Sequence, residues 1–164
     1  RVTLTDYRGN IIYDTYVQPT QPVADYRTAE TGLRREHLEH APQILDVRHQ
    51  VATLLQDKIL VGYALWELLS VMRLAHPAIS TRDTALFMSF RRSLGYKPRH
   101  VVPLPELVKR FMGHDIGLHG DVPVERARAA LDLFRSCETT WEGMIATGAW
   151  PCALPPDDYR AHFT

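Results

Sequence analysis

The sequence is poor in the features that mark membrane proteins and disulfide-rich secreted domains. Its 164 residues contain two cysteines, Cys137 and Cys152, whose spacing fits neither a metal-binding nor a redox motif. We therefore expect both thiols to be reduced, in an intracellular protein. No apolar run approaches the roughly 18 residues that a bilayer-spanning helix needs, because Lys58, Glu67 and Arg73 interrupt the most apolar stretch. The sequence thus argues against a membrane protein.

An excess of charge of one sign is also missing. The 19 lysines and arginines balance 19 aspartates and glutamates, which gives a formal net charge of zero. Proteins dedicated to nucleic acids usually carry a basic excess, because the neutralisation of phosphates supplies much of their affinity. Neutrality lowers the expectation of nucleic-acid binding, although it leaves room for a local basic patch.

The length of the chain and its hydrophobic content of 45% are those of one globular domain with its own core. We expect this domain to span residues 1–145. Residues 146–164 contain three prolines and are expected to form an irregular C-terminal tail. Because the chain begins with Arg1 rather than methionine, we also expect it to be a fragment or a processed product.

Local patterns predict both strands and helices. Residues 2–5 alternate apolar and polar side chains, residues 11–17 are β-branched and aromatic, and the Gly9–Asn10 turn between them predicts a β-hairpin. The all-apolar run 59–61 is typical of a strand that is buried on both faces of a sheet. We expect an edge strand near 79–81, and apolar spacings of three and four predict helices over 44–55, after Gly62, over 104–112 and from Pro123 onward.

Four segments resemble the sequence motifs of one nuclease family. Residues 59–69 are similar to the pattern I-L-V-G-H-A-x-x-x-D-L, and residues 121–128 align without gaps on H-x-S-V-E-D-A-R. Residues 25–33 resemble D-Y-R-T-x-x-x-G-I, and residues 82–84 carry R-D-T. These motifs are those of the DEDDh 3′→5′ exonucleases, and the chain resembles in particular the branch of RNA exonuclease 4.

The resemblance implies an α/β fold of the ribonuclease-H-like class, with three layers and a mixed sheet. The hairpin, the buried strand 59–61 and the edge strand near 79–81 should then lie in one sheet. In this family the central strand precedes the hairpin and carries a D-x-E motif, and the present chain begins after that point. We expect the central strand upstream of Arg1. A sheet that lacks its central strand leaves two rows of backbone N–H and C=O groups without hydrogen-bond partners. We therefore expect an open groove beside Val61 or a strand donated by a neighbour.

The resemblance also implies the chemistry of the family, in which four carboxylates hold two divalent metals and a histidine acts as general base. Three of these positions carry other residues, since Leu68 and Arg126 replace aspartates and Asp121 replaces the histidine. Leucine offers no oxygen ligand and arginine repels a cation. We therefore expect no intact catalytic set and no bound metal or other cofactor, with Glu67 and Glu125 as fallback candidates.

Each replacement also has a structural interpretation. Leu68 completes the apolar stripe of its helix and is expected in the core, whereas Glu67 lies roughly 100° away around the helix. Arg126 is expected on a solvated helix face. Asp121 is expected to cap the helix that begins near Pro123.

Candidate nucleic-acid contacts come from a basic loop that contains an aromatic residue. Such a loop can grip a single strand through phosphate contacts and base stacking, although it is also typical of a solvated surface. Tyr63 and Trp66 flank the lost acid position, where they either stack on a base or fill the emptied metal pocket. The residues of the basic loop are Arg91, Arg92, Tyr96, Lys97, Arg99 and His100.

These patterns together predict a catalytically degenerate exonuclease domain, or pseudo-exonuclease, that binds RNA, another single-stranded nucleic acid or a protein partner. The alternative is an active 3′→5′ exonuclease that uses Mg²⁺ or Mn²⁺ on RNA or single-stranded nucleic acid, as in ribosomal RNA processing. The family resemblance implies a location in the nucleus or nucleolus. We expect no association with membranes.

Overall fold

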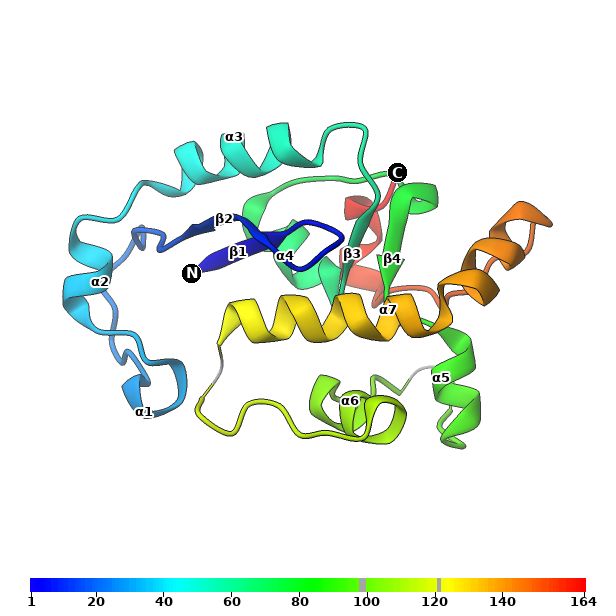
Figure 1. Ribbon diagram of the computed structural model, residues 1–164. Helices are drawn as coiled ribbons and strands as arrows, with labels where there is room; N and C mark the ends of the chain where they lie inside the picture. The colour runs from blue at the N-terminus through cyan, green and yellow to red at the C-terminus, as the bar shows by residue number, and fades with distance from the viewer. Residues whose placement is uncertain (98–99, 121) are drawn as a thin grey trace.

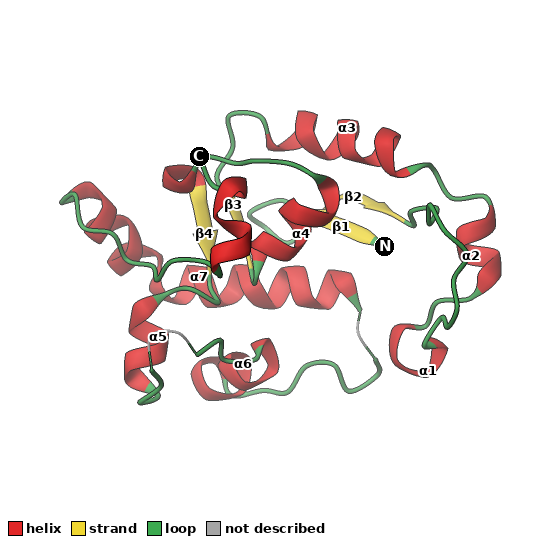
Figure 2. Ribbon diagram, turned by 180° about the vertical axis from the view of Figure 1, so that it is seen from behind, coloured by secondary structure: helices red, strands yellow, loops and turns green. Residues whose placement is uncertain are grey.

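The computed structural model describes residues 1–97, 100–120 and 122–164 (Figure 1). Helix α7 (Pro123–Ala146) covers one face of the strands and α4 (Leu65–Met72) lies on the other, as the front and rear views show (Figures 1 and 2). This layering agrees with the predicted α/β class.

The strands are β1 (Val2–Thr5), β2 (Ile11–Thr15), β3 (Leu60–Gly62) and β4 (Thr81–Asp83). The helices are α1 (Thr28–Thr31), α2 (Arg35–Glu39), α3 (Ile44–Leu55), α4 (Leu65–Met72), α5 (Met88–Ser93), α6 (Leu104–Met112) and α7 (Pro123–Ala146), with 3₁₀ turns η1 (Ala78–Ser80) and η2 (Asp157–His162).

The first two strands form the predicted hairpin. They pair antiparallel, with a bulge between Leu4 and Thr5. In the turn, Oδ1 of Asp6 accepts the backbone N–H of Asn10 at 2.8 Å. Gly9 takes a φ of 83°, a conformation that side chains disfavour, which explains glycine at this position.

Strands β3 and β4 pair in parallel, with α4 in the connection between them. The backbone N–H and the hydroxyl of Thr84 both donate to the carbonyl of Gly62 at 2.9 Å. Glycine suits the point where β3 turns toward α4, because a Cβ at position 62 would lie 2.4 Å from Cδ2 of Leu65 and that side chain would have to move. Both predicted strands are confirmed, although they begin one and two residues later than expected.

The prediction of one continuous sheet is wrong for the part of the chain that the structure describes. There, β1 pairs only with β2, and β3 pairs only with β4. A groove of about 640 Å³ separates the two pairs, and Leu4, Val61 and Leu131 are among its lining residues. No described segment lies between β1 and β3 to carry main-chain hydrogen bonds from one edge to the other. The expected open groove beside Val61 is therefore confirmed.

Helix α7 supports both strand pairs, since it contacts β1 and β3 (Figure 1). It begins at Pro123 as predicted, because proline suits the first turn of a helix. Its residue Trp141 is fully buried and stacks on Phe87, with ring centroids 4.2 Å apart. None of the described helices, α7 included, is both long and apolar enough to cross a membrane.

The C-terminal tail is docked on the domain. The backbone N–H of His76 donates to the carbonyl of His162 at 2.9 Å, and that of Ala153 donates to Leu86 at 2.8 Å. Phe163 packs against the buried cluster that contains Leu86. Residues Asp157–His162 of the tail form η2, so the expectation of an irregular tail does not hold throughout its length. The domain boundary after residue 145 stays a prediction.

Candidate functional site

A buried carboxylate fixes the turn that leads from β3 into α4. Asp83, at the end of β4, accepts the backbone N–H groups of Ala64, Leu65 and Ala85 at 2.9, 2.8 and 3.0 Å. Ala64 has a φ of 52°, and these hydrogen bonds hold its strained left-handed conformation in place. Burial raises the pKa of Asp83 to about 7. The turn thereby sets the position of Tyr63 and of the first turn of α4.

Tyr63, at the histidine of the pattern I-L-V-G-H-A, meets Arg126, at the position of a metal-binding aspartate. The hydroxyl of Tyr63 donates to the carbonyl of Val102 at 2.8 Å. The guanidinium carbon of Arg126 lies 5.9 Å from the centroid of the Tyr63 ring, which is cation–π range. Burial raises the pKa of Tyr63 to about 12, although the charge of Arg126 acts in the opposite direction. The site therefore contains a fixed aromatic ring with a cation beside it.

Leu68 and Glu67 point to different surroundings. Leu68 is partly buried and packs with Leu55 and Leu74 against two buried clusters, as expected for a core leucine. Glu67 is exposed. Its charge helps to raise the pKa of Tyr63, so it lies near that phenol. The structure thus places Leu68 among apolar side chains and Glu67 at the surface.

Glu125 is engaged in holding a loop. Its Oε2 accepts the backbone N–H of Gly117 at 3.1 Å, which ties the segment before α7 to the first turn of that helix. The anion also lies at the end of α7 where the helix dipole favours negative charge. Asp121, the residue at the family's histidine position, lies outside the described residues.

The described residues do not supply the oxygen ligands of a two-metal centre at this site. Position 68 holds leucine and position 126 holds arginine, whose charge opposes that of a metal ion. Within residues 1–97, 100–120 and 122–164, no group of three or more histidine, cysteine, aspartate and glutamate side chains is placed to hold a metal. Positions 68 and 126 therefore lack the carboxylates that the family motifs imply for metal binding.

The basic loop is only partly available to a ligand. Arg92 and Lys97 are exposed. Arg91 is 3% exposed and donates through Nε and Nη2 to the carbonyl of Ala85, so its guanidinium is part of the interior. This burial corrects the expectation of a surface role for Arg91.

The aromatic residues near the site are also engaged by other groups of the protein. The hydroxyl of Tyr96 donates to Glu106 at 2.8 Å, and its ring stacks on His100 with centroids 4.4 Å apart. Trp66 is buried in the cluster that also contains Leu86. Its burial there argues against stacking on a base, and the expectation that it fills the emptied metal pocket stays a prediction. Arg99 lies outside the described residues.

An ion pair between a buried arginine and a partly exposed glutamate links β4 to the far half of α7. Arg82 donates from Nε and Nη2 to the two carboxylate oxygens of Glu142 at 2.6 and 2.9 Å. It also donates from Nη1 to the carbonyl of Ile79 at 2.7 Å. The R-D-T segment marked Arg82 in the sequence, but nothing there indicated a partner 60 residues away.

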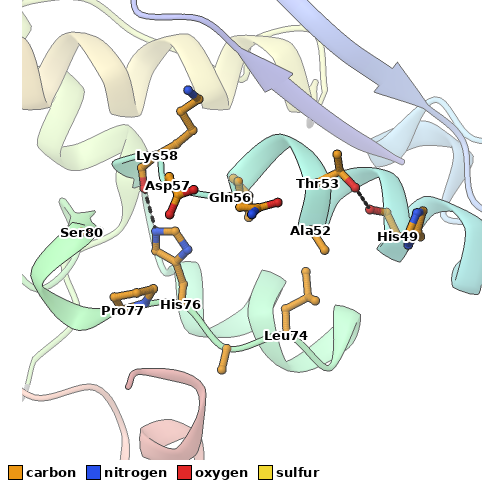
Figure 3. Close-up of a pocket in the computed structure, with 12 residues that line it drawn as sticks. His49, Ala52, Thr53, Gln56, Asp57, Lys58, Leu74, His76, Pro77 and Ser80 are labelled. Carbon is orange, nitrogen blue, oxygen red and sulfur yellow. Dashed lines mark hydrogen bonds between the residues drawn. The ribbon is translucent and has the colours of Figure 1, made fainter.

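A separate pocket of about 430 Å³ lies between the end of α3 and the loop after α4 (Figure 3). Its least exposed polar member is His76, whose Nε2 lies 3.1 Å from the carbonyl oxygen of Lys58. The backbone of His76 is bound to the C-terminal tail. These bonds give His76 a structural role, and no motif in the sequence had indicated it.

The chain is similar in sequence to known nucleases. Human apoptosis-enhancing nuclease is 34% identical over 160 residues, which are 96% of this chain and 48% of that protein. RNA exonuclease 4 of Mycosarcoma maydis is 38% identical over 147 residues, or 88% of this chain and 38% of the relative. The chain therefore spans about half, or less, of these curated relatives. No family model matches it.

Solved structures support the fold. The catalytic unit of Neurospora crassa Pan2, which holds a protease and a nuclease domain, superposes with a TM-score of 0.70 at 19% identity over 90% of this chain and 24% of the other. The Saccharomyces cerevisiae Pan2 exonuclease module in complex with A7 RNA gives 0.66 at 22% identity, over 85% of this chain and 25% of the other. The predicted ribonuclease-H-like class is thereby confirmed.

Proposed function

Because this chain belongs to the DEDDh exonuclease family, we propose that its domain binds single-stranded RNA without cleaving it. The observation that carries the proposal is the guanidinium of Arg126 beside the ring of Tyr63. A cation stands there at the position where the family motif has a metal-binding aspartate. The same substitution that opposes a metal favours a phosphate.

We propose that the domain does not cleave RNA because positions 68 and 126 lack metal ligands that the reaction requires. In-line displacement at a phosphodiester uses two metals that activate a water and stabilise the leaving oxygen. Such hard cations bind oxygen ligands, which Leu68 does not have. Arg126 would repel a metal, and Glu125 is bonded to Gly117. We therefore propose that the domain works without Mg²⁺ or Mn²⁺.

Binding of RNA is supported by the charges that remain exposed and by the relatives. Arg92 and Lys97 are exposed, and Arg126 is partly exposed. One relative is named RNA exonuclease 4, and one structural neighbour was solved with A7 RNA. Contacts to phosphates by such side chains predict an affinity that falls steeply with salt. A nuclear or nucleolar location forms part of the same proposal.

A protein partner is the second candidate, and one surface favours it. Trp150 is 44% exposed and Leu154 is 66% exposed, and both line an apolar pocket with Leu86 and Phe163. An exposed apolar surface is typical of a protein-interaction site. The third candidate, an active exonuclease that contributes to ribosomal RNA processing, requires the acids of an upstream D-x-E motif together with Glu67, Asp121 or Glu125 in rearranged roles.

Retention of a labelled single-stranded RNA on this protein, measured over a series of salt concentrations, tests the proposal. We expect retention that weakens with salt and an RNA that keeps its length. The matched control is a double-stranded RNA of the same sequence, which should be retained less. No retention at low salt would reject RNA as the ligand and leave the protein partner. Retention followed by shortening from the 3′ end would show an active enzyme.

A further inference from the structure

We propose that Arg126 binds a phosphate of the RNA directly, and so takes the place of a metal ion as the positive charge of the site. This inference rests on the proposed function. It adds the group that contacts the RNA backbone directly, the guanidinium of Arg126.

Arg126 is held by a backbone hydrogen bond within α7 and by a contact of its guanidinium with an aromatic ring. It lies in the first turns of α7, where its backbone N–H donates to the carbonyl of Val122 at 3.1 Å. Its guanidinium carbon is 5.9 Å from the ring centroid of Tyr63. The helix therefore sets the start of the side chain, and the aromatic ring is one of the groups that its charged end contacts.

The ring that positions this guanidinium is itself held at both ends. The hydroxyl of Tyr63 is bound to the carbonyl of Val102 at 2.8 Å. On the backbone side, the next residue, Ala64, donates its N–H to the buried carboxylate of Asp83 at 2.9 Å. Because the ring is fixed, the guanidinium beside it is partly ordered before a ligand arrives. Binding then requires less ordering of the side chain.

The chemistry of arginine suits a phosphate. A guanidinium stays charged at all ordinary pH values and carries five N–H donors in one plane, which match the oxygens of a phosphate in pairs. Its attraction to the face of an aromatic ring is compatible with donation along its edge. In a metal-dependent nuclease the carboxylates would repel a phosphate unless metals lay between them, whereas Arg126 needs no such intermediary.

Two acidic residues, Glu67 and Glu125, affect the charge of the site. Glu67 is exposed and lies near Tyr63, so it reduces the local positive charge. Glu125 is bonded to the backbone of Gly117 at 3.1 Å. Neutralising Glu67 should therefore strengthen RNA binding if Arg126 holds a phosphate, because it removes a competing anion.

Fluorescence anisotropy of a labelled single-stranded RNA tests the inference, with the dissociation constant measured in EDTA and in Mg²⁺. We expect similar affinities under both conditions, since no metal takes part. Arg126→Ala should weaken binding by roughly tenfold or more, the size of a lost charge-assisted hydrogen bond. Arg126→Lys should recover part of the affinity, because it keeps the charge but not the paired donors.

Arg135 provides a matched control on the same helix. It also places a guanidinium beside a tyrosine ring, 5.2 Å from the centroid of Tyr7, and it pairs with Asp132 at 3.6 Å. Arg135→Ala removes the same side chain and the same kind of contact away from Tyr63. We expect it to change the affinity for RNA by less than about twofold, since surface contacts of this kind contribute little. Thermal melting of each variant checks that the fold is retained.

The outcomes separate this inference from the proposed function. If the protein binds RNA but Arg126→Ala binds as tightly as the parent, Arg126 is not the phosphate ligand. The inference also fails if EDTA abolishes binding, because a metal then supplies the charge. If the parent protein binds no RNA, the proposed function is itself rejected. Loss of affinity in Arg126→Ala, with Arg135→Ala and EDTA without effect, supports the inference.

Discussion

Glu142→Ala should lower the free energy of unfolding by about 3 kcal/mol, because it leaves a buried guanidinium without its counter-charge. The side chain of Arg82 is 4% exposed, and it donates to both oxygens of Glu142 at 2.6 and 2.9 Å. Breaking a buried pair from one side typically destabilises by about 3–5 kcal/mol. The side chain of Glu142 is 38% exposed, so solvent screens part of the interaction and the lower end of that range applies.

Urea unfolding followed by tryptophan fluorescence measures this loss. Glu142→Gln keeps one acceptor oxygen and should be destabilised by about half as much. The control is Glu39→Ala, which removes the partner of Arg35 in a surface pair with an N–O distance of 3.4 Å. Because both of those side chains are more than half exposed, the control should change stability by less than about 0.5 kcal/mol.

A double variant isolates the cause of the effect. Arg82→Met combined with Glu142→Ala removes both charges and keeps an unbranched side chain in the interior. It should be more stable than Glu142→Ala alone, because no buried charge is left unpaired. If Glu142→Ala is no less stable than Glu39→Ala, the pair contributes nothing beyond a surface contact and the reasoning is refuted.

Two further substitutions and one thiol reaction test other parts of the structure. Leu68→Asp, which supplies the acid of the family motif, should lower stability by about 2 kcal/mol, because it places a carboxylate against apolar side chains; an unchanged urea midpoint would contradict the packing. Tyr63→Phe removes the hydrogen bond to Val102 and should lower stability by about 1 kcal/mol; it should also weaken RNA binding slightly, because the ring beside Arg126 loses one of its two anchors. Burial raises the pKa of both Cys137 and Cys152 to about 12, so at pH 8 these thiols should react with an aromatic disulfide reagent far more slowly in the folded protein than in urea. Equal rates would show that the thiols are accessible.

Short-range features of the fold could be predicted from the sequence because they depend on neighbouring residues. The Gly9–Asn10 turn predicts the hairpin, since glycine allows the positive φ that the structure shows. Proline at position 123 marks the start of α7. The apolar spacing of its helix predicts that Leu68 packs in the core, and it does so. In each case the pattern reports a local conformation or one buried face.

Long-range features were less predictable. The expected single sheet required a strand between β1 and β3, and no described segment lies there. Arg91 belongs to a basic run in the sequence, but its guanidinium is turned inward by the carbonyl of Ala85. The partners of Arg82 and Arg126 lie 60 and 63 positions away along the chain, too far for any periodic pattern to show. Only the three-dimensional arrangement brings these side chains together.

The most direct test of RNA binding without cleavage is the intact mass of a single-stranded RNA after prolonged incubation with this protein and Mn²⁺. The protein should be in excess, so that most of the RNA is bound. We expect the mass to stay unchanged, because the described site offers a cation where the reaction needs metal ligands. A series of products that are each one nucleotide shorter, and that disappear with the double variant Glu67→Gln and Asp121→Asn, would contradict the proposal and show an active exonuclease.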